Sequence, residues 1–183
     1  MLNNFFLILL LVLITACSFD YKEAMISEEL EGGTPNAVII NLSETVIRKG
    51  KISYCFEAER AEAFEKRNLT IFTNIQFSEY DKTGKIATEG EVGLAHYYSD
   101  TENIIFERNF RIASLQQGYF IKGESIFWVG DTRTLRSDLE KEIIMGKDNG
   151  SYITGTGFSA RASDNSFNFE GGVRGVYVSE NEE

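Results

Sequence analysis

Histidine, cysteine and proline are almost absent from this sequence: its 183 residues include one histidine, two cysteines and one proline. These are too few for the clustered ligands of a zinc site. The single histidine, His96, follows Val92 and Leu94 at two-residue spacing, which is typical of a core or groove-edge residue rather than a catalytic base. Carboxylates are plentiful, but Glu57 and Glu59 alternate with apolar residues, as on a solvated strand face. We therefore predict no enzymatic activity, no metal and no other cofactor.

Positive charge is also scarce. The chain has 18 Lys and Arg against 28 Asp and Glu, which gives a formal net charge of −10. Phosphate backbones repel such a chain, so nucleic-acid binding is excluded as a function class. Electrostatic attachment to an anionic membrane surface is disfavoured for the same reason.

The sequence lacks an apolar run of the roughly 20 residues that span a bilayer. Residues 5–14 form an unbroken apolar run of ten, which suits the core of a secretion signal. The run leads into Ile14-Thr15-Ala16-Cys17, which resembles the lipobox of bacterial lipoproteins, although asparagines stand at positions 3 and 4 where basic residues are usual. This predicts a signal helix of the lipoprotein type at 1–16 and a lipidated Cys17 that anchors the protein to a membrane. An ordinary signal peptide, or an apolar segment that stays uncleaved, is the alternative.

The regions next to the predicted domain are polar. Residues 17–36 are acidic and contain the only proline, Pro35, so they are predicted to form a lipidated tether. Residues 179–183 are predicted to be a frayed tail. Once Cys17 carries lipid, Cys55 is the remaining thiol, and we expect it to be a small packing residue.

Between these ends, apolar residues recur at every second position. In ISYCFEA, for example, Ile52, Tyr54 and Phe56 share one face. Turn-forming clusters such as DKTG at 81–84 and DNGS at 148–151 separate the alternating segments. This pattern predicts an all-β domain over residues 37–178.

A short strand-like phrase occurs four times: IFTNIQF at 71–77, FERNFRI at 106–112, LRSDLEK at 135–141 and FEGGVRG at 169–175. Each copy has an apolar residue, two spacers, then Asn, Asp or Gly, then a second apolar residue. The two apolar residues are four positions apart, so we expect them to share a face, with the polar or glycine residue pointing away at a bend or bulge.

The phrase belongs to a longer repeat. Units that start at residues 58, 90, 123 and 157 are spaced by 32, 33 and 34 residues (90−58, 123−90, 157−123). Residues 58–66, AERAEAFEK, are good helix formers, but they occupy a strand position in this repeat and are predicted as a strand. A period of this length indicates stacked hairpins that form one long, curved antiparallel sheet.

With these features the chain resembles the LptC-type proteins of lipopolysaccharide export, in the OstA-like superfamily. The resemblance covers about residues 35–178 and is most specific in GESIFWVGDTRTLRSDLEKEIIMGKDNGSYITGTGFSARASDNSFNFEGGVRGVYV, residues 123–178. The chain departs from the family in having a lipobox where many members keep an uncleaved transmembrane helix. It also has Arg108-Asn109-Phe110 where glycine, asparagine and valine are usual, and Lys141 and Gly175 interrupt the apolar stripe.

The resemblance implies a periplasmic β-jellyroll, a twisted half-pipe of antiparallel strands with an apolar interior. Such proteins accept lipopolysaccharide, or a related acylated glycolipid, from the permease of an inner-membrane ABC transporter. They pass it to a bridge protein of the same fold, an LptA-like partner, by edge-to-edge strand pairing. The implied location is the periplasmic side of the inner membrane, with a lipid anchor, whereas Ser18 after the cysteine favours outer-membrane sorting. Because the chain is acidic, we expect the phosphorylated sugar head to stay outside while the acyl chains lie inside.

The sites predicted from this reading are a lipid groove, two partner edges and the lipidation site Cys17. Ile40 marks the edge that faces the transporter, and Arg174 and Val176 mark the edge that faces the bridge protein. Phe127 and Trp128 are expected on opposite faces. The predicted groove residues are Ile71, Ile75, Phe77, Val92, Leu94, Phe106, Phe110, Ile112, Leu135, Leu139, Phe169 and Val173.

A second function stays open at this point: a membrane-anchored structural or interaction lipoprotein with a closed core. A closed core and an open groove need the same alternation of residues. Phe110→Arg is expected to separate the two, because an arginine in an open groove reaches water along its stem whereas a buried unpaired charge unfolds the protein. We expect a folded and inactive protein.

Overall fold

The computed structural model describes residues 33–161 and 166–179, and the strands in these residues form one antiparallel β-sheet. The prediction of an all-β domain is confirmed. The predicted signal helix at 1–16, Cys17, most of the tether at 17–36 and residues 180–183 of the tail lie outside the described residues. In the described part, no helix has the length and apolar character needed to cross a membrane.

The sheet in the described residues contains 13 strands and is accompanied by one short 3₁₀ helix, η1 (Glu65–Arg67). Five long strands of 12 to 14 residues come first, and shorter strands of three to five residues follow. The strands are β1 (Ala37–Arg48), β2 (Lys51–Phe64), β3 (Leu69–Tyr80), β4 (Ile86–Tyr98), β5 (Asn103–Ser114), β6 (Tyr119–Gly123), β7 (Ile126–Val129), β8 (Thr134–Arg136), β9 (Glu142–Gly146), β10 (Tyr152–Thr156), β11 (Phe158–Arg161), β12 (Ser166–Phe169) and β13 (Val173–Val176).

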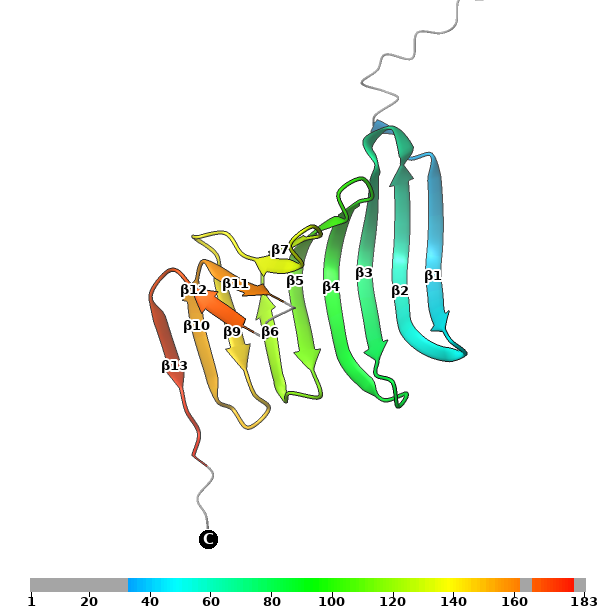
Figure 1. Ribbon diagram of the computed structural model, residues 1–183. Coiled ribbons are helices and arrows are strands. Elements are labelled where there is room, and N and C mark those ends of the chain that lie inside the picture. Colours follow the sequence, from blue (N-terminus) through cyan, green and yellow to red (C-terminus); the bar gives the residue numbers. More distant parts are fainter. Residues whose placement is uncertain (1–32, 162–165, 180–183) are drawn as a thin grey trace, which may run out of the picture. The chain divides into compact units, whose positions relative to one another are not determined.

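Each of the strands β1 to β5 pairs with the next one along the chain (Figure 1). Lys49 and Gly50 connect β1 to β2 with φ angles of 52° and 76°, which is the geometry of a two-residue type I′ hairpin turn. Residues 58–64 of the segment AERAEAFEK belong to β2, so the prediction of a strand there is confirmed up to Phe64, where η1 follows.

A line of unusual backbone conformation crosses the long strands. Asn41 in β1 and Asn74 in β3 have φ angles of 54° and 50°, and Arg108 and Asn109 in β5 have φ angles of 57° and 68°. Positive φ is uncommon outside glycine, and asparagine tolerates it better than most residues. The remaining positions on this line are Glu59 in β2 and Gly93 in β4, as the register of the neighbouring pairs shows. We call these six residues the crease.

The crease changes which residues of a strand face the interior. In β3, Phe72 and Ile75 are three residues apart, yet both pack into one hydrophobic cluster. A regular strand would point them to opposite faces. The neighbouring β4 behaves in the same way, since Val92 pairs with Ile75 and Ala95 pairs with Phe72, and both are buried.

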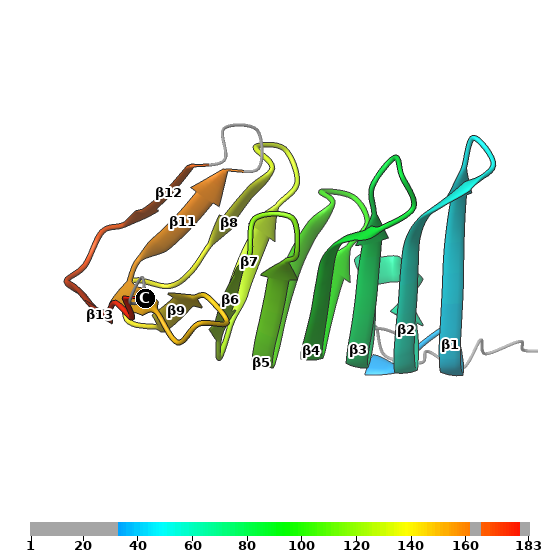
Figure 2. The same cartoon turned by 90° about the horizontal axis from the view of Figure 1, so that it is seen from below.

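Beyond β5 the sheet divides at the crease. The strand β6 pairs with one half of β5, and β7 pairs with the other half. From there β9, β10 and β13 extend the first half, which we call half-sheet A, and β8, β11 and β12 extend the second, half-sheet B. Each half-sheet includes the parts of β1–β5 on its side of the crease. Figure 2 shows β7, β8, β11 and β12 diverging from β6 and β9.

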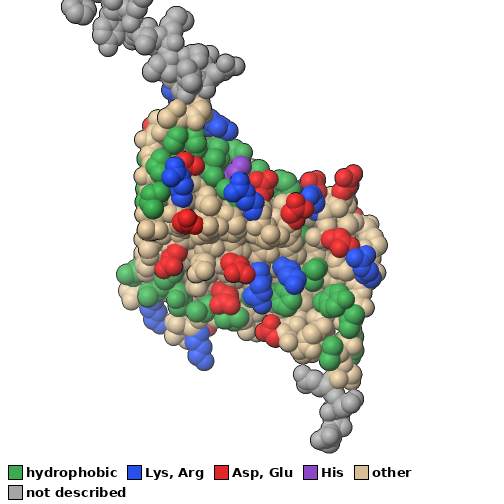
Figure 3. Space-filling view, turned by 180° about the vertical axis from the view of Figure 1, so that it is seen from behind, with side chains coloured by type: hydrophobic (Ala, Val, Ile, Leu, Met, Phe, Trp, Pro, Cys, Tyr) green, Lys and Arg blue, Asp and Glu red, His purple; other side chains and the backbone are tan. Residues whose placement is uncertain are grey.

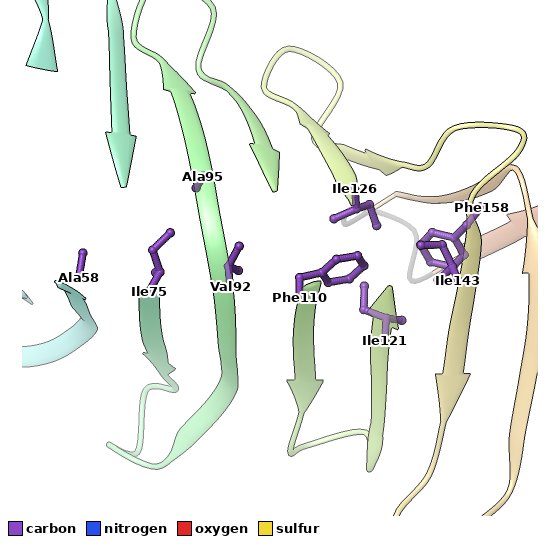
Figure 4. Packing of buried hydrophobic residues seen from close by; sticks show 9 residues of the cluster. All are labelled: Ala58, Ile75, Val92, Ala95, Phe110, Ile121, Ile126, Ile143 and Phe158. Atoms are coloured by element: carbon purple, nitrogen blue, oxygen red, sulfur yellow. The ribbon is translucent and has the colours of Figure 1, made fainter. Parts of the chain in front are cut away.

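The hydrophobic core fills the angle between the half-sheets next to the crease. Ile126 of β7 and Ile143 of β9 have no exposed surface, and Phe158 of β11 is 2% exposed. These three residues come from both half-sheets and hold them together (Figure 4). The buried cluster consists of Ala58, Ile75, Val92, Ala95, Phe110, Ile121, Ile126, Ile143 and Phe158.

The four copies of the repeated phrase have two structural forms. The copies at 71–77 and 106–112 are continuous strands with Asn74 and Asn109 at the crease. The other two copies connect the half-sheets: β8 ends at Arg136 before β9 begins, and β12 ends at Phe169 before β13 begins. The prediction of four equivalent strands is therefore wrong for the copies at 135–141 and 169–175, because the sheet has already divided there.

A hydrogen-bond network joins two neighbouring turns of half-sheet A, the turn between β3 and β4 and the turn between β5 and β6. The Asp81 carboxylate accepts hydrogen bonds from the hydroxyl and the backbone N–H of Thr83, at 2.6 and 2.7 Å, and from the backbone N–H of Lys85 at 3.0 Å. Gln116, in the turn between β5 and β6, donates to its second oxygen at 3.2 Å. These bonds, led by that of the Thr83 hydroxyl, lower the pKa of Asp81 to about 2.

We predict that Gly93→Ala destabilises the fold, because a β-carbon at this position would lie 2.4 Å from the Arg108 carbonyl oxygen and 2.9 Å from the Arg108 Cβ. Backbone atoms at the crease cannot move aside at low cost, so we expect a loss of about 1–3 kcal/mol in the free energy of unfolding. Gly172→Ala is the matched control, since nothing lies within 4 Å of its β-carbon position. Equal urea midpoints for the two variants would contradict the crease geometry.

Candidate functional site

The half-sheets enclose a groove on the side away from the crease. It consists of two adjoining hollows of about 880 and 710 Å³. Tyr119, Met145 and Phe167 line both hollows, so they form one continuous space that extends from β4 and β5 towards β13. We call this space the groove.

The walls of the groove are largely apolar, and each half-sheet supplies one wall. Half-sheet A contributes Ile112, Ile121 and Met145, and half-sheet B contributes Trp128 and Leu135. Trp128 pairs with Leu135 across β7 and β8, so the two side chains share the interior face of half-sheet B. Apolar walls of this kind can bury hydrocarbon.

The groove is closed at its base and polar at its opening. The base is the buried cluster, in which Phe110 is only 3% exposed. The opening carries side chains of both charges, among them Asp81, Lys82 and Arg133. An apolar chain can therefore lie in the groove between the half-sheets, with polar groups at its opening.

Aromatic side chains continue the interior face of half-sheet A towards β1. Tyr54 stacks on Phe56 and on Phe77, with ring centroids 6.4 and 6.2 Å apart. Burial of Tyr54, together with the negative charges of Glu44 and Glu79, raises the pKa of its hydroxyl to about 12. This end of the interior therefore carries a neutral phenol between two carboxylates.

Eight of the predicted groove residues lie on the interior face. Ile75, Val92 and Phe110 belong to the buried cluster at the base, and five others pack against it: Phe77, Phe106, Ile112, Leu135 and Phe169. Of these eight, Ile112 and Leu135 line the groove itself.

Four predicted groove residues lie elsewhere. Ile71 pairs with Glu62 and His96 on the face opposite Phe72, so the prediction that Ile71 and Ile75 share a face is wrong. Leu94 is next to the buried Ala95 and likewise points away. The cause is the crease, which reverses the alternation within one strand.

The remaining two corrections concern residues in the divided part of the sheet. Leu139 lies between β8 and β9 and is 64% exposed. Val173 is the first residue of β13 and is 54% exposed. Neither shares a strand with its predicted partner, so the expected four-residue spacing does not apply to Leu135 and Leu139 or to Phe169 and Val173.

His96 also differs from expectation. It pairs with Ile71 and Ile105 on the face turned away from the interior, and its Nε2 lies 3.9 Å from a Glu107 carboxylate oxygen. In the described residues, no group of three or more His, Cys, Asp or Glu side chains is arranged to hold a metal ion.

Sequence reasoning missed a group of wall and base residues, of which Ile121, Ile126, Ile143, Met145 and Phe158 are examples. They lie in the short strands that follow the division of the sheet, where two-residue alternation extends over only a few positions. The expectation that Phe127 and Trp128 face opposite sides is confirmed, because Phe127 pairs with Arg136 while Trp128 pairs with Leu135 and lines the groove.

In the part of the chain that the structure describes, each strand at an end of the sheet is paired on one side. At one end β1 pairs only with β2, and its Val38, Ile39 and Ile40 are 44–55% exposed. At the other end β13 pairs only with β10, and β12 pairs only with β11. In β13, Val176 is 48% exposed, and Arg174 forms an ion pair with Glu142 at 2.6 Å. Unpaired edges of this kind accept strands from other chains.

A comparison with protein families gives a match over nearly the whole chain. The family model described as lipopolysaccharide-assembly, LptC-related, matches residues 6–178. No curated protein matches the chain. Among solved structures the chain is similar to LptH from Pseudomonas aeruginosa, described as the LptA-homologous periplasmic component of the lipopolysaccharide transport device. The identity is 10%, the TM-score is 0.31, and the match covers 81% of this chain and 99% of that chain.

Proposed function

We infer that this chain, which belongs to the LptC-related family of lipopolysaccharide-assembly proteins, carries the acyl chains of lipopolysaccharide in the groove between its half-sheets. The family makes the protein a non-enzymatic component of lipopolysaccharide transport that acts in the periplasm. The observation that supports the finer proposal is the groove itself, with apolar walls on both half-sheets and a polar rim.

The physical basis is the transfer of hydrocarbon out of water. Each methylene group that enters the groove contributes about 0.8 kcal/mol. Because the walls are long and offer no single deep pocket, an acyl chain finds many positions of similar free energy along them. Such a surface suits a carrier that must release its cargo better than it suits a tight receptor.

The free edges provide the contacts to partners. We propose that β1 pairs with the ABC permease of the export system and that β13 pairs with an LptA-like bridge protein of the same fold. In each case the added strand would extend a half-sheet and continue the apolar interior. The exposed apolar side chains of β1 and β13 would then be covered by the partner.

The anchor belongs to the same proposal. A lipidated Cys17 would hold the protein at a membrane, and two or three acyl chains make such attachment durable. Mass spectrometry of the mature N-terminus checks this point, since an unmodified or uncleaved start would exclude it.

A structural lipoprotein with a closed core is the alternative function. The cluster around Ile126, Ile143 and Phe158 is sealed, but it occupies only the region next to the crease. The groove beyond it is open, which favours transport.

The position of Phe110 changes the expected outcome of one experiment. Phe110 lies in the sealed cluster and is 3% exposed. An arginine there would bury an unpaired charge, so Phe110→Arg is expected to unfold the protein even if the groove carries lipid. A substitution that blocks lipid binding but leaves the protein folded must therefore be made at a residue on the groove wall.

We predict that Leu135→Arg gives a folded protein that binds lipopolysaccharide at least tenfold more weakly, a loss of about 1.4 kcal/mol or more. Leu135 lines the groove, and an arginine there can reach the polar rim while its charge blocks the path of an acyl chain. Leu139→Arg is the matched control, because this leucine is 64% exposed and lies outside the groove. Fluorescence anisotropy with labelled lipopolysaccharide measures binding, and circular dichroism melting checks the fold.

Equal affinity of the two arginine variants, both folded, would remove the groove as the binding site. A loss of binding in the Leu139 variant alone would place the acyl chains on the loop between β8 and β9 instead.

We also predict that photocrosslinkers at Ile40 and Arg174 capture different proteins in living cells. Ile40 lies in β1 and Arg174 in β13, at opposite ends of the path of paired strands. The expected products are the ABC permease from Ile40 and the bridge protein from Arg174, identified by mass spectrometry. A crosslinker at Glu57 in β2 is the control, because this strand has neighbours on both sides. Capture of the same protein from both ends would contradict a head-to-tail relay.

A further inference from the structure

The outer face of half-sheet A contains a further hollow, which adjoins the groove at the turn between β9 and β10. It has a volume of about 420 Å³ and lies over β6, β9, β10 and β13. Its lining includes Phe120, Lys122, Tyr152, Thr154 and Arg174. We call it the outer pocket. Figure 3 shows charged side chains of both signs on the face of the molecule seen from behind.

The outer pocket is locally positive in a protein of net charge −10. Lys122, Lys147 and Arg174 line it, against the single carboxylate of Glu142. Arg174 is paired with Glu142 at 2.6 Å. Within the described residues, Lys122 and Lys147 form no ion pair, so two positive charges are available to a ligand. A group with negative charge is therefore the ligand that this pocket favours.

One polar side chain in the pocket has an unmet hydrogen-bonding requirement. Thr154 is 4% exposed, and its hydroxyl has no hydrogen-bond partner among the described residues. Buried hydroxyl groups are nearly always paired, so an unpaired one calls for an explanation such as an absent ligand or water. Thr154 pairs with Ile144 and with Arg174, so the side chains of Thr154 and Arg174 lie on the same face of the sheet.

Two aromatic rings complete the lining. The Lys122 ammonium lies 5.6 Å from the centroid of the Phe120 ring, and Tyr152 is 41% exposed. Aromatic faces next to cations, a hydroxyl and a carboxylate suit a ligand that has both apolar C–H surface and anionic groups. A phosphorylated sugar has these properties.

The outer pocket and the groove adjoin at one turn. Lys147, Ser151 and Tyr152 line the outer pocket and also line the hollow of about 710 Å³ inside. Lys147 and Ser151 belong to the turn between β9 and β10, and Tyr152 begins β10. The turn is well hydrogen-bonded: the Lys147 N–H donates to the Ser151 carbonyl at 2.8 Å, and the Gly150 N–H donates to the Lys147 carbonyl at 3.1 Å. A molecule that lies across this turn can reach both spaces.

We propose that the outer pocket binds a phosphorylated sugar in the head group of the glycolipid whose acyl chains lie in the groove. The molecule crosses the turn between β9 and β10, with its tails inside and its anionic head on the outer face. Lys122 and Lys147 bind the phosphate, and the Thr154 hydroxyl donates to it or to a sugar oxygen. This proposal rests on the proposed function, because the groove supplies the tails.

The first experiment uses a water-soluble head without tails. We would titrate the ¹⁵N-labelled full-length protein, in a non-ionic detergent, with glucosamine 1-phosphate and follow the backbone amides by NMR. Saturable shifts are expected at Lys122 and Thr154, and none at Ile112 or Leu135 in the groove. Inorganic phosphate and unphosphorylated glucosamine are run in parallel, and each should bind at least threefold more weakly than the sugar phosphate.

Variants test the residues. Lys122→Gln combined with Lys147→Gln should weaken binding of the sugar phosphate at least fivefold. Lys49→Gln combined with Lys85→Gln is the matched control, since it removes the same two charges from exposed turns outside the pocket. Thr154→Val keeps the shape and removes only the hydroxyl, so it should weaken binding without lowering the melting temperature. Equal affinities of the wild type and the double variant would overturn the proposal, as would the absence of saturable shifts in the wild type.

The second experiment uses intact lipopolysaccharide and distinguishes this proposal from the proposed function. Trp128 lines the groove, so its fluorescence reports entry of the tails. The double lysine variant should keep the full change in fluorescence but require a several-fold higher lipid concentration. An unchanged concentration would show that the intact glycolipid does not use the pocket and that the pocket takes only free sugar phosphates. No fluorescence change in the wild type, with the NMR shifts present, would instead reject the groove and keep the pocket as a site for free sugar phosphates.

Discussion

The architecture depends on one constraint, the interruption of regular strand geometry along a line through five adjacent strands. Left-handed residues at Asn41, Asn74, Arg108 and Asn109 reverse the side-chain alternation at the same level of the sheet. In a regular strand, only residues an even number of positions apart lie on the same face. With the reversal, the two halves can incline towards each other and still present apolar faces inward. The later strands continue this arrangement by stopping at the line and entering one half-sheet or the other.

The sequence predicts the class of fold well and the faces less well. Two-residue alternation and turn clusters are local properties, and they identified an all-β sheet of hairpins. A bend or bulge was expected at Asn74 and Asn109, and both have positive φ angles. The assignment of Ile71 and Leu94 failed because the hydrophobic pattern does not show that such residues reverse the alternation of side chains. Leu139 and Val173 failed for another reason: strands of three to five residues are too short for periodicity to show where one half-sheet ends. The asparagine in the middle of an apolar strand indicated an irregularity there, but not its effect on which side chains face the interior.

The division of the interior shows how one domain can be stable and still leave an open groove for the proposed cargo. Next to the crease, residues such as Ile126 and Ile143 from opposite half-sheets are completely buried and stabilise the fold. Farther out, Trp128, Leu135 and Met145 line open space. Stability and the proposed binding of acyl chains therefore use different residues, so the groove does not have to collapse for the protein to fold. Net charge is misleading in the same way, because an acidic total coexists with a basic pocket on one face.

The two ends of the sheet are not alike, and this gives the molecule a direction. At one end, β1 offers a single edge of 12 residues that is bent at Asn41. At the other end, β12 and β13 offer two separate edges of four residues each. A strand that follows β1 over its full length must bend at the same level, whereas a straight strand can match only one side of the bend. A strand that pairs along the whole edge of β1 must therefore match this edge as a template, in both its length and its bend. Since neither short edge of the same chain meets that template, copies of this protein are poorly suited to joining one another in an endless fibre.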